Sequence, residues 1–236
     1  MSIISDIQAC AHPDKAKVYA RFFKTGKGEY GEGDLFLGLT VPEQRALAKK
    51  YVDLSFEEIE ELLYNKYHEH RLTGLIILVY KYEKASPEQR EKIIDFYIKH
   101  KHRGNNWDLI DCVADKLLGK HLIDRDKSLL YELARSDSVW DRRIAIITTF
   151  EFIRHKKFDD TLRIAEILLH DKHDLIQKAV GWMLREVGKR DEKTLLKFLD
   201  AYAHEMPRTM LRYAIERLDS ETKKKYLNAK KAKSFC

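Results

Sequence analysis

Three tryptophans mark the segments of this sequence whose residues could do chemistry. Trp107 and Asp111 are four residues apart in NNWDLID, and Trp140 and Arg143 are three apart in SVWDRRIAI. Residues three or four apart on a helix are neighbours. An aromatic ring would therefore lie beside a carboxylate in the first segment and beside a guanidinium in the second. For any one tryptophan, burial between helices with the charge exposed to solvent explains the pattern equally well.

Trp182 completes the set, in LIQKAVGWMLREVGK. It follows Lys178 by four residues and precedes Arg185 by three, which places it on the basic side of its helix, away from most of the apolar residues. An indole among cations either stacks on one of them or is available to a flat or sugar-like ligand. Three segments of this kind indicate a binding surface more strongly than one does.

The charged positions in these segments recur at a regular interval, which predicts an all-α repeat fold. Five helical segments are each headed by a charged residue that is followed two or three positions later by Ala or Gly, at spacings of 40, 32, 35 and 34 residues: Arg71, Asp111, Arg143, Lys178 and Arg212. A period in the mid-thirties to forties is typical of an α-solenoid built from helix pairs. The charged residues would then recur on one binding face. Helices joined by short loops can also give such spacings by chance, and this alternative stays open.

Glycine and proline are rare and confined to a few places, which favours helix along most of the chain. The sequence has 10 glycines and 4 prolines, and five of the glycines lie between residues 26 and 38. Ser86 and Pro87 are typical of a helix N-cap and first position, and Pro42 and Pro207 mark similar starts. No segment alternates between apolar and polar residues with a period of two, so no strands are expected.

Apolar residues at steps of three and four predict a helix over residues 68–84. One face of that helix would carry five apolar side chains: Leu72, Leu75, Ile76, Val79 and Tyr82.

The charge distribution predicts one domain followed by a basic tail. The formal net charge is +6, and six lysines without an acidic residue lie between residues 223 and 233. Residues 1–222 are therefore neutral overall, and we expect them to form a single repeat domain, with residues 223–236 as a Lys-rich C-terminal tail. Bulk charge alone consequently does not indicate a nucleic-acid partner.

Several classes of protein and site are not expected. No window is long and apolar enough to span a membrane, and the N-terminus lacks the pattern of a signal peptide, so we expect a cytoplasmic protein without a membrane partner. Three widely spaced cysteines predict reduced thiols. Gly26 to Gly31 match GxGxxG, but without a preceding strand the segment reads as a flexible loop. The histidine pairs at 68/70 and 100/102 would point in different directions on a helix, and the pair at 170/173 lacks a third ligand, so no metal is expected.

The tryptophan segments, together with FLGLTVPEQR and MPRTMLRYAIE, resemble the AlkD-like alkylpurine DNA glycosylases of the DNA alkylation repair family. The resemblance runs from about Phe22 to Leu218 in the same order. It implies a curved superhelix of HEAT-like repeats with a concave DNA-binding face. It also implies excision of N3- and N7-alkylated purines, such as 3-methyladenine and 7-methylguanine, from duplex DNA. No cofactor is implied, and we expect a monomer.

The resemblance assigns roles to individual residues. Trp107 and Trp182 resemble the aromatic pair that packs on the deoxyribose of the lesion, and Asp111 the catalytic carboxylate between them. Arg143 resembles an arginine that holds the DNA backbone near the lesion, and Arg185 a further phosphate contact.

The phase of the repeats adds three candidate DNA-binding residues: Lys178, Trp140 and Arg212. At Val41 some relatives carry a hydroxyl group, so a contact through that side chain is not expected. No role is transferred to the Gly-rich loop at residues 24–34.

These residue types suit the implied reaction. An N3- or N7-alkylated purine is cationic and leaves without being protonated, so the enzyme must stabilise an oxocarbenium-like sugar and place a water molecule. A carboxylate beside aromatic faces can do this. The main alternative is a catalytically silent repeat scaffold that binds DNA or protein. A metal-dependent nuclease would need clustered carboxylates or histidines, which the sequence lacks.

Overall fold

The computed structural model describes residues 2–228 and confirms the all-α class. Within these residues the only β-type contact is an isolated bridge between Leu35 and Tyr67. The chain divides into two compact units, Met1–His121 and Leu122–Cys236, which are described separately. The predicted superhelical arrangement of the repeats stays a prediction.

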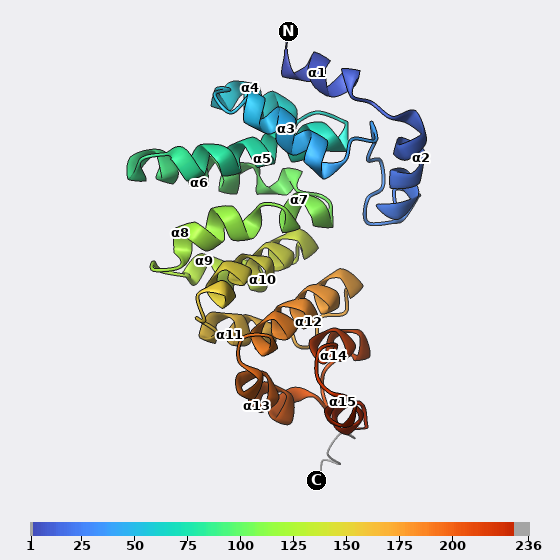
Figure 1. Ribbon diagram of the computed structural model, residues 1–236, viewed down its shortest axis with the longest axis vertical. Coiled ribbons are helices and arrows are strands. Elements are labelled where there is room, and N and C mark those ends of the chain that lie inside the picture. The colour runs from blue at the N-terminus through green and yellow to red at the C-terminus, as the bar shows by residue number, and fades with distance from the viewer. Residues whose placement is uncertain (1, 229–236) are drawn as a thin grey trace. The chain divides into compact units, whose positions relative to one another are not determined.

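The first unit contains helices α1 to α7, two short helical turns and the start of α8 (Figure 1). Their bounds are α1 Ile3–Ala9, α2 Pro13–Phe22, α3 Val41–Lys50, α4 Phe56–Leu63, α5 His68–Lys84, α6 Pro87–His100, η1 Lys101–Arg103, α7 Trp107–Asp111, η2 Asp115–Gly119 and α8 Lys120–Leu122.

Helix α5 forms the centre of this unit, at the bounds predicted for residues 68–84. Helices α3, α4, α6 and α7 all pack against it. The predicted apolar face is therefore only part of its buried surface, because Ile77 and Leu78 on other sides of the helix are also fully buried. A helix that is packed on several sides carries apolar residues on all of them, so its sequence pattern does not show which face points toward the core.

The predicted helix starts are confirmed. Pro87 is the first residue of α6, and the Ser86 hydroxyl accepts a hydrogen bond from the backbone N–H of Gln89. Helix α3 begins after Thr40, where the Glu43 carboxylate accepts from the Thr40 backbone N–H at 2.7 Å. These capping contacts satisfy donors that the first turn of a helix leaves unpaired.

The Gly-rich segment after α2 is a loop, as predicted, but a compact one with its own hydrogen bonds. The backbone N–H of Gly31 donates to the Lys24 carbonyl at 3.0 Å, and the Glu29 carboxylate accepts from the Gly26 N–H at 2.9 Å. A Cβ at position 31 would lie 2.4 Å from the Phe23 carbonyl oxygen, so only glycine fits there. The loop thereby folds back onto the end of α2 and delivers Asp34 to the interior.

The second unit contains helices α9 to α15. Their bounds are α9 Ser128–Ala134, α10 Val139–Arg154, α11 Asp159–Ile167, α12 Asp174–Gly188, α13 Glu192–Tyr202, α14 Arg208–Ala214 and α15 Ser220–Leu227. Helix α12 packs against α10, α13 and α14.

The first lysines of the predicted tail belong to α15. Tyr226 in this helix is buried and donates a hydrogen bond to the Asp200 carboxylate at 2.8 Å. The remainder of the predicted tail, residues 229–236, lies outside the described residues, and so does Cys236. No helix in the described part of the chain is long and apolar enough to cross a membrane.

The close packing of α12 on α14 gives a stability prediction. A Cβ on Gly181 would lie 2.5 Å from the Met210 carbonyl oxygen and 2.5 Å from Tyr213 Cβ. Helix propensity alone would make Gly181→Ala stabilising by up to about 1 kcal/mol. We expect it instead to destabilise the protein by about 1–3 kcal/mol, measured by urea unfolding, because the two helices must separate.

Gly74→Ala is the graded control, because its Cβ would come no closer than 3.2 Å to Leu62 Cβ. A gain in stability for Gly181→Ala would show that the packing of α12 on α14 is looser than described.

Candidate active site

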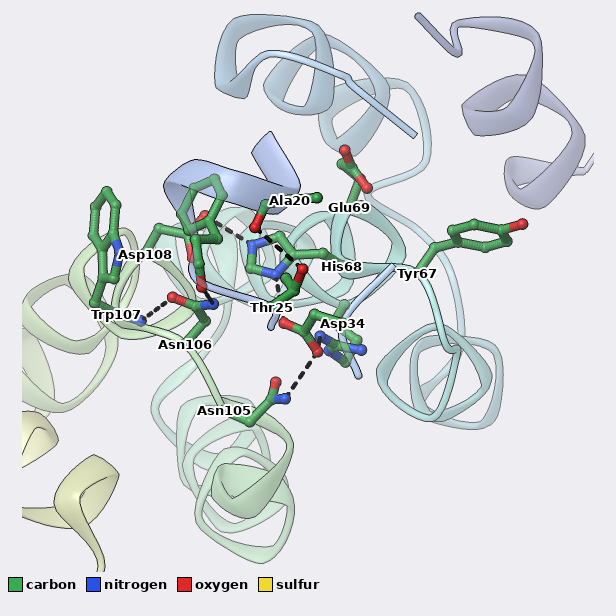
Figure 2. Close-up of polar contacts among 12 residues, drawn as sticks. Ala20, Thr25, Asp34, Tyr67, His68, Glu69, Asn105, Asn106, Trp107 and Asp108 are labelled. Carbon is green, nitrogen blue, oxygen red and sulfur yellow. Dashed lines mark hydrogen bonds and ion pairs between the residues drawn. The ribbon is translucent and has the colours of Figure 1, made fainter. Parts of the chain in front are cut away.

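Helix α7 places Trp107 and Asp111 on one short helix, as the spacing predicted. The side chain of Asn106 caps this helix by accepting a hydrogen bond from the Trp107 backbone N–H at 2.9 Å (Figure 2). Asn106 is fully buried and its amide also donates to the Phe23 carbonyl. Trp107 and Asp111 are both half-buried, so each retains a surface that solvent can reach.

A buried histidine connects α7 to the rest of its unit. His68, the first residue of α5, lies between two carboxylates: its Nε2 is 2.8 Å from Asp108 Oδ2 and its Nδ1 is 3.2 Å from Asp34 Oδ2. Figure 2 shows the imidazole between these two side chains. All three residues are buried. Arg71 and Asn105 complete the network by donating to Asp34 Oδ1 at 2.7 Å and 2.9 Å.

The network keeps His68 charged at neutral pH. Burial by itself would lower its pKa, but the Asp108 charge and the hydrogen bonds to Asp108 and Asp34 outweigh burial and raise the pKa of His68 to about 9. Burial opposes ionisation of Asp34 as well, yet hydrogen bonding to His68 and the Arg71 charge hold the pKa of Asp34 below its usual value. An imidazolium therefore donates one hydrogen bond to each carboxylate.

Aromatic rings extend this network to Trp107. Phe36 stacks on the His68 ring at 4.6 Å between ring centroids, and Phe23 stacks on Phe36 at 5.0 Å. Trp107 in turn stacks on the Phe23 ring at 5.2 Å, while Phe22 meets Trp107 edge-on at 5.8 Å. The indole of Trp107 is therefore oriented by a stack of rings that ends on a buried cation.

The cysteine that follows Asp111 is not a candidate nucleophile. Burial raises the pKa of Cys112 to about 11, with a smaller contribution from the Asp108 charge. Its thiol is protonated at neutral pH and therefore weakly nucleophilic. Cys10 and Cys112 are both free, in agreement with the predicted reduced thiols.

The other predicted site residues lie in the second unit, where α12 carries three of them. Trp182 is half-buried, and its ring lies 5.7 Å from Phe150. Lys178 pairs with Asp174 at 2.6 Å, and Arg185 forms an ion pair with Glu216.

The remaining predicted residues of this unit differ in exposure. Arg143 on α10 is only 5% exposed, and its Nη1 donates to the Leu175 carbonyl oxygen at 2.6 Å. It therefore holds the first turn of α12, and its predicted contact with DNA stays a prediction. Trp140 is half-buried, and Arg212 on α14 is exposed.

A family model described as DNA alkylation repair enzyme matches residues 3–218, which is nearly the whole chain. The chain belongs to the DNA alkylation repair enzyme family. Its structure is also similar to that of a protein described as a predicted DNA alkylation repair enzyme from Enterococcus faecalis. The TM-score is 0.70 at 18% sequence identity, with 89% of this chain and 97% of the other covered. At that identity the likeness concerns the fold. Comparison with curated proteins gives no match.

The buried ion network around His68 in this member of the DNA alkylation repair enzyme family was not predicted from the sequence. The spacing of His68 and His70 bears only on metal binding, whereas in the structure the two histidines differ in protonation state. His68 is charged, whereas burial lowers the pKa of His70 to about 4 and keeps it neutral. In the described part of the chain, no group of three or more His, Cys, Asp or Glu side chains is placed to hold a metal ion. The two carboxylate partners of His68, Asp34 and Asp108, could not be recognised from the sequence, because they lie 34 and 40 residues away from it.

The two histidines predict opposite effects of pH on stability. The folded pKa of His68 lies above its ordinary 6.5, so its contribution is complete below pH 6.5 and is lost as the pH rises through about 9. The folded pKa of His70 lies below 6.5, so its contribution is present above pH 6.5 and is lost as the pH falls toward 4.

We therefore expect His68→Gln to abolish most of the fall in unfolding free energy between pH 6.5 and 9, measured by urea unfolding across that range. His70→Gln, the same substitution on the same helix, is the control and should keep the fall. An alkaline loss of stability in His68→Gln equal to that of the wild type would contradict the assignment of a charged His68.

Proposed function

We propose that this protein is a DNA glycosylase that hydrolyses the N-glycosidic bond of cationic N3- and N7-alkylated purines in duplex DNA, as the first step of base excision repair. Membership of the DNA alkylation repair enzyme family supports a role in DNA repair. The observation that carries the finer assignment is the pairing of Trp107 and Asp111 on α7, which a buried ion network holds in place. A carboxylate beside an ordered aromatic face suits a sugar that develops positive charge.

The proposed reaction needs little from the protein beyond charge stabilisation. An alkylated purine such as 7-methylguanine or 3-methyladenine leaves as a neutral molecule, so no general acid is required. In the proposal Asp111 stabilises the oxocarbenium-like sugar and orients the attacking water. Trp107 and Trp182 pack against the deoxyribose. No cofactor enters this reaction, and a monomer suffices because one chain supplies every residue.

In the same proposal the second unit supplies most of the contacts to the DNA backbone. Lys178 and Arg185 are held by exposed carboxylates, and a phosphate can exchange with these partners at little cost because exposed ion pairs contribute less than about 1 kcal/mol. Arg212 is exposed. Arg143 and Trp140 are assigned to the DNA surface on the resemblance and the repeat phase.

The decisive experiment compares duplexes that are identical except for one lesion. We expect release of 7-methylguanine and 3-methyladenine, detected as free base and as abasic sites. Hypoxanthine and uracil should be released at least about 100-fold more slowly, because an anionic leaving group costs several kcal/mol more without an acid and each 1.36 kcal/mol is tenfold in rate. Comparable release of hypoxanthine would reveal an acid that the proposal lacks. Release of no base would leave a silent DNA-binding scaffold.

Asp111→Asn tests the proposed catalytic carboxylate. We expect excision of 7-methylguanine to fall by about two to four orders of magnitude, the range for loss of a key charged group, while DNA affinity changes little because a carboxylate does not attract phosphate. Single-turnover excision and fluorescence anisotropy measure the two effects. Asp14→Asn, at a fully exposed carboxylate on α2, is the matched control. Wild-type excision by Asp111→Asn would exclude this role.

Arg185→Ala tests the proposed backbone contact. We expect weaker binding to damaged and undamaged duplexes alike, and a slope of log affinity against log salt that is smaller by about one unit. Arg154→Ala is the control, because Arg154 also pairs with a glutamate but has no assigned DNA contact. The test is best made in a chain that ends at Asn228, which keeps α15 intact and removes the last lysines. An unchanged salt slope would place the backbone contact elsewhere.

A further inference from the structure

Helices α10 and α12 pack together in the second unit (Figure 1), and Phe150 of α10 contacts Trp182 of α12 there. The centroids of the two rings are 5.7 Å apart, and the ring planes are inclined by 54°. Both residues are half-buried, so the contact lies at the border of the packed interior. The orientation of the Trp182 indole therefore depends on where the Phe150 ring is held.

Two guanidinium groups hold the Phe150 ring. The Arg154 Cζ atom lies 4.0 Å from the ring centroid, and the Arg190 Cζ atom lies 5.8 Å from it. A cation within about 6 Å of an aromatic centroid is attracted to the ring. Arg154 belongs to α10 and Arg190 follows the end of α12, so both helices contribute to holding the ring.

Buried glutamates fix the two arginines. Arg154 Nη1 donates to Glu151 Oε2 at 2.6 Å, and Arg190 Nη1 donates to Glu186 Oε2 at 2.9 Å. Glu151 and Glu186 are only 8% and 5% exposed. Burial opposes ionisation of Glu186, yet hydrogen bonds from Lys189 and Arg190 hold the pKa of this carboxyl below its usual value. Each guanidinium is therefore tied to a carboxylate that is itself fixed in the protein interior.

The spacing along each helix gathers these residues on one side. Trp182, Glu186 and Arg190 follow one another at steps of four, and Phe150 and Arg154 are also four apart. Residues four apart are neighbours on a helix surface. Arg190 lies just beyond the end of α12, and its hydrogen bond to the Glu186 backbone carbonyl at 2.9 Å keeps it on this side. The two rings and the ion pairs consequently form one cluster where α10 meets α12.

We propose that Phe150 is a positioning residue, which holds the indole of Trp182 in the orientation in which that indole packs against the deoxyribose of the lesion. The inference rests on the proposed function, which assigns the contact with the sugar to Trp182. An aliphatic side chain at position 150 would serve helix packing alone, whereas a ring restricts its aromatic neighbour to particular inclinations. Trp107 has support of the same kind, because the Phe23 ring stacks on it at 5.2 Å. Each tryptophan then meets the sugar already oriented, which removes an entropic cost from the reaction.

Single-turnover excision of 7-methylguanine at saturating protein tests this role. Phe150→Leu keeps an apolar side chain but removes the ring. We expect the excision rate to fall about 10-fold to 100-fold, because misplacement of an active-site group by about 1 Å can cost a factor of about 100. DNA affinity should stay within about 2-fold of the wild type, since no phosphate contact is removed. Phe150→Tyr keeps the ring and should restore most of the rate.

Phe56→Leu is the matched control. Phe56 is also a half-buried phenylalanine that packs on another ring, at 4.8 Å from Phe96 in the first unit, and its variant should keep the wild-type rate. Thermal unfolding checks that each variant is folded. Phe150→Met, whose flexible side chain fills the same space, replaces Phe150→Leu if that variant is unfolded. A wild-type excision rate in whichever of the two is used would overturn the proposal.

A double-mutant cycle with Trp182→Ala shows whether Phe150 acts through Trp182. We expect Phe150→Leu to cause no further fall in rate once the indole is absent, because the effects of coupled residues are not additive. An equal fall in both backgrounds would show that Phe150 supports another part of the protein, and would refute its positioning role.

NMR relaxation of the Trp182 indole N–H measures the order of the ring without any reaction. The resonance is assigned by its absence from Trp182→Ala. We expect an order parameter of about 0.85 in the wild type and in Phe150→Tyr, as for rigid backbone, and a value below about 0.6 in Phe150→Leu. The Trp107 indole should keep its wild-type value in each variant. A Trp182 indole that stays equally ordered in Phe150→Leu would contradict the proposal.

The outcomes separate this inference from the proposed function. Excision of 7-methylguanine at the wild-type rate by Phe150→Leu would refute the positioning role and leave the glycosylase assignment intact. Loss of Trp182 order in Phe150→Leu, in a protein that excises nothing, would refute the glycosylase and retain Phe150 as the residue that orders Trp182.

Discussion

The buried imidazolium of His68 is the contact on which the first unit depends. It joins three segments that are distant in the chain, namely the end of the Gly-rich loop through Asp34, the start of α5, and α7 through Asp108. Ion pairs buried in this way are expensive to desolvate and are retained only with good geometry and further hydrogen bonds. Arg71 and Asn105 provide those hydrogen bonds at Asp34.

The buried ion pairs fix the position of α7. A helix of five residues is too short to be stable by itself, so its orientation must come from outside. The salt bridge at Asp108, the Asn106 cap and the stack of rings on Trp107 supply three independent restraints. They fix the position of Trp107 and of the short helix that carries Asp111 before any ligand arrives.

Local features of this fold could be predicted from the sequence, and long-range ones could not. The helix over residues 68–84 and the start at Pro87 follow from periodicity and capping, which are properties of neighbouring residues. The pairing of Trp107 with Asp111 also needs only one turn of helix. The role of His68 depends on partners 34 and 40 residues away, which no spacing rule connects. The burial of Arg143 escaped prediction for the same reason, since it depends on the packing of α10 against α12.

The protonation state of His68 tests the central claim most directly. Nitrogen-15 chemical shifts of the His68 ring, recorded between pH 6 and pH 10, report whether one or both nitrogens carry a proton. The account predicts two N–H groups at pH 7.5, with loss of a proton only near pH 9, because each nitrogen faces a carboxylate. A ring with one unprotonated nitrogen at pH 7.5 would contradict it and would remove the charged link that positions α7.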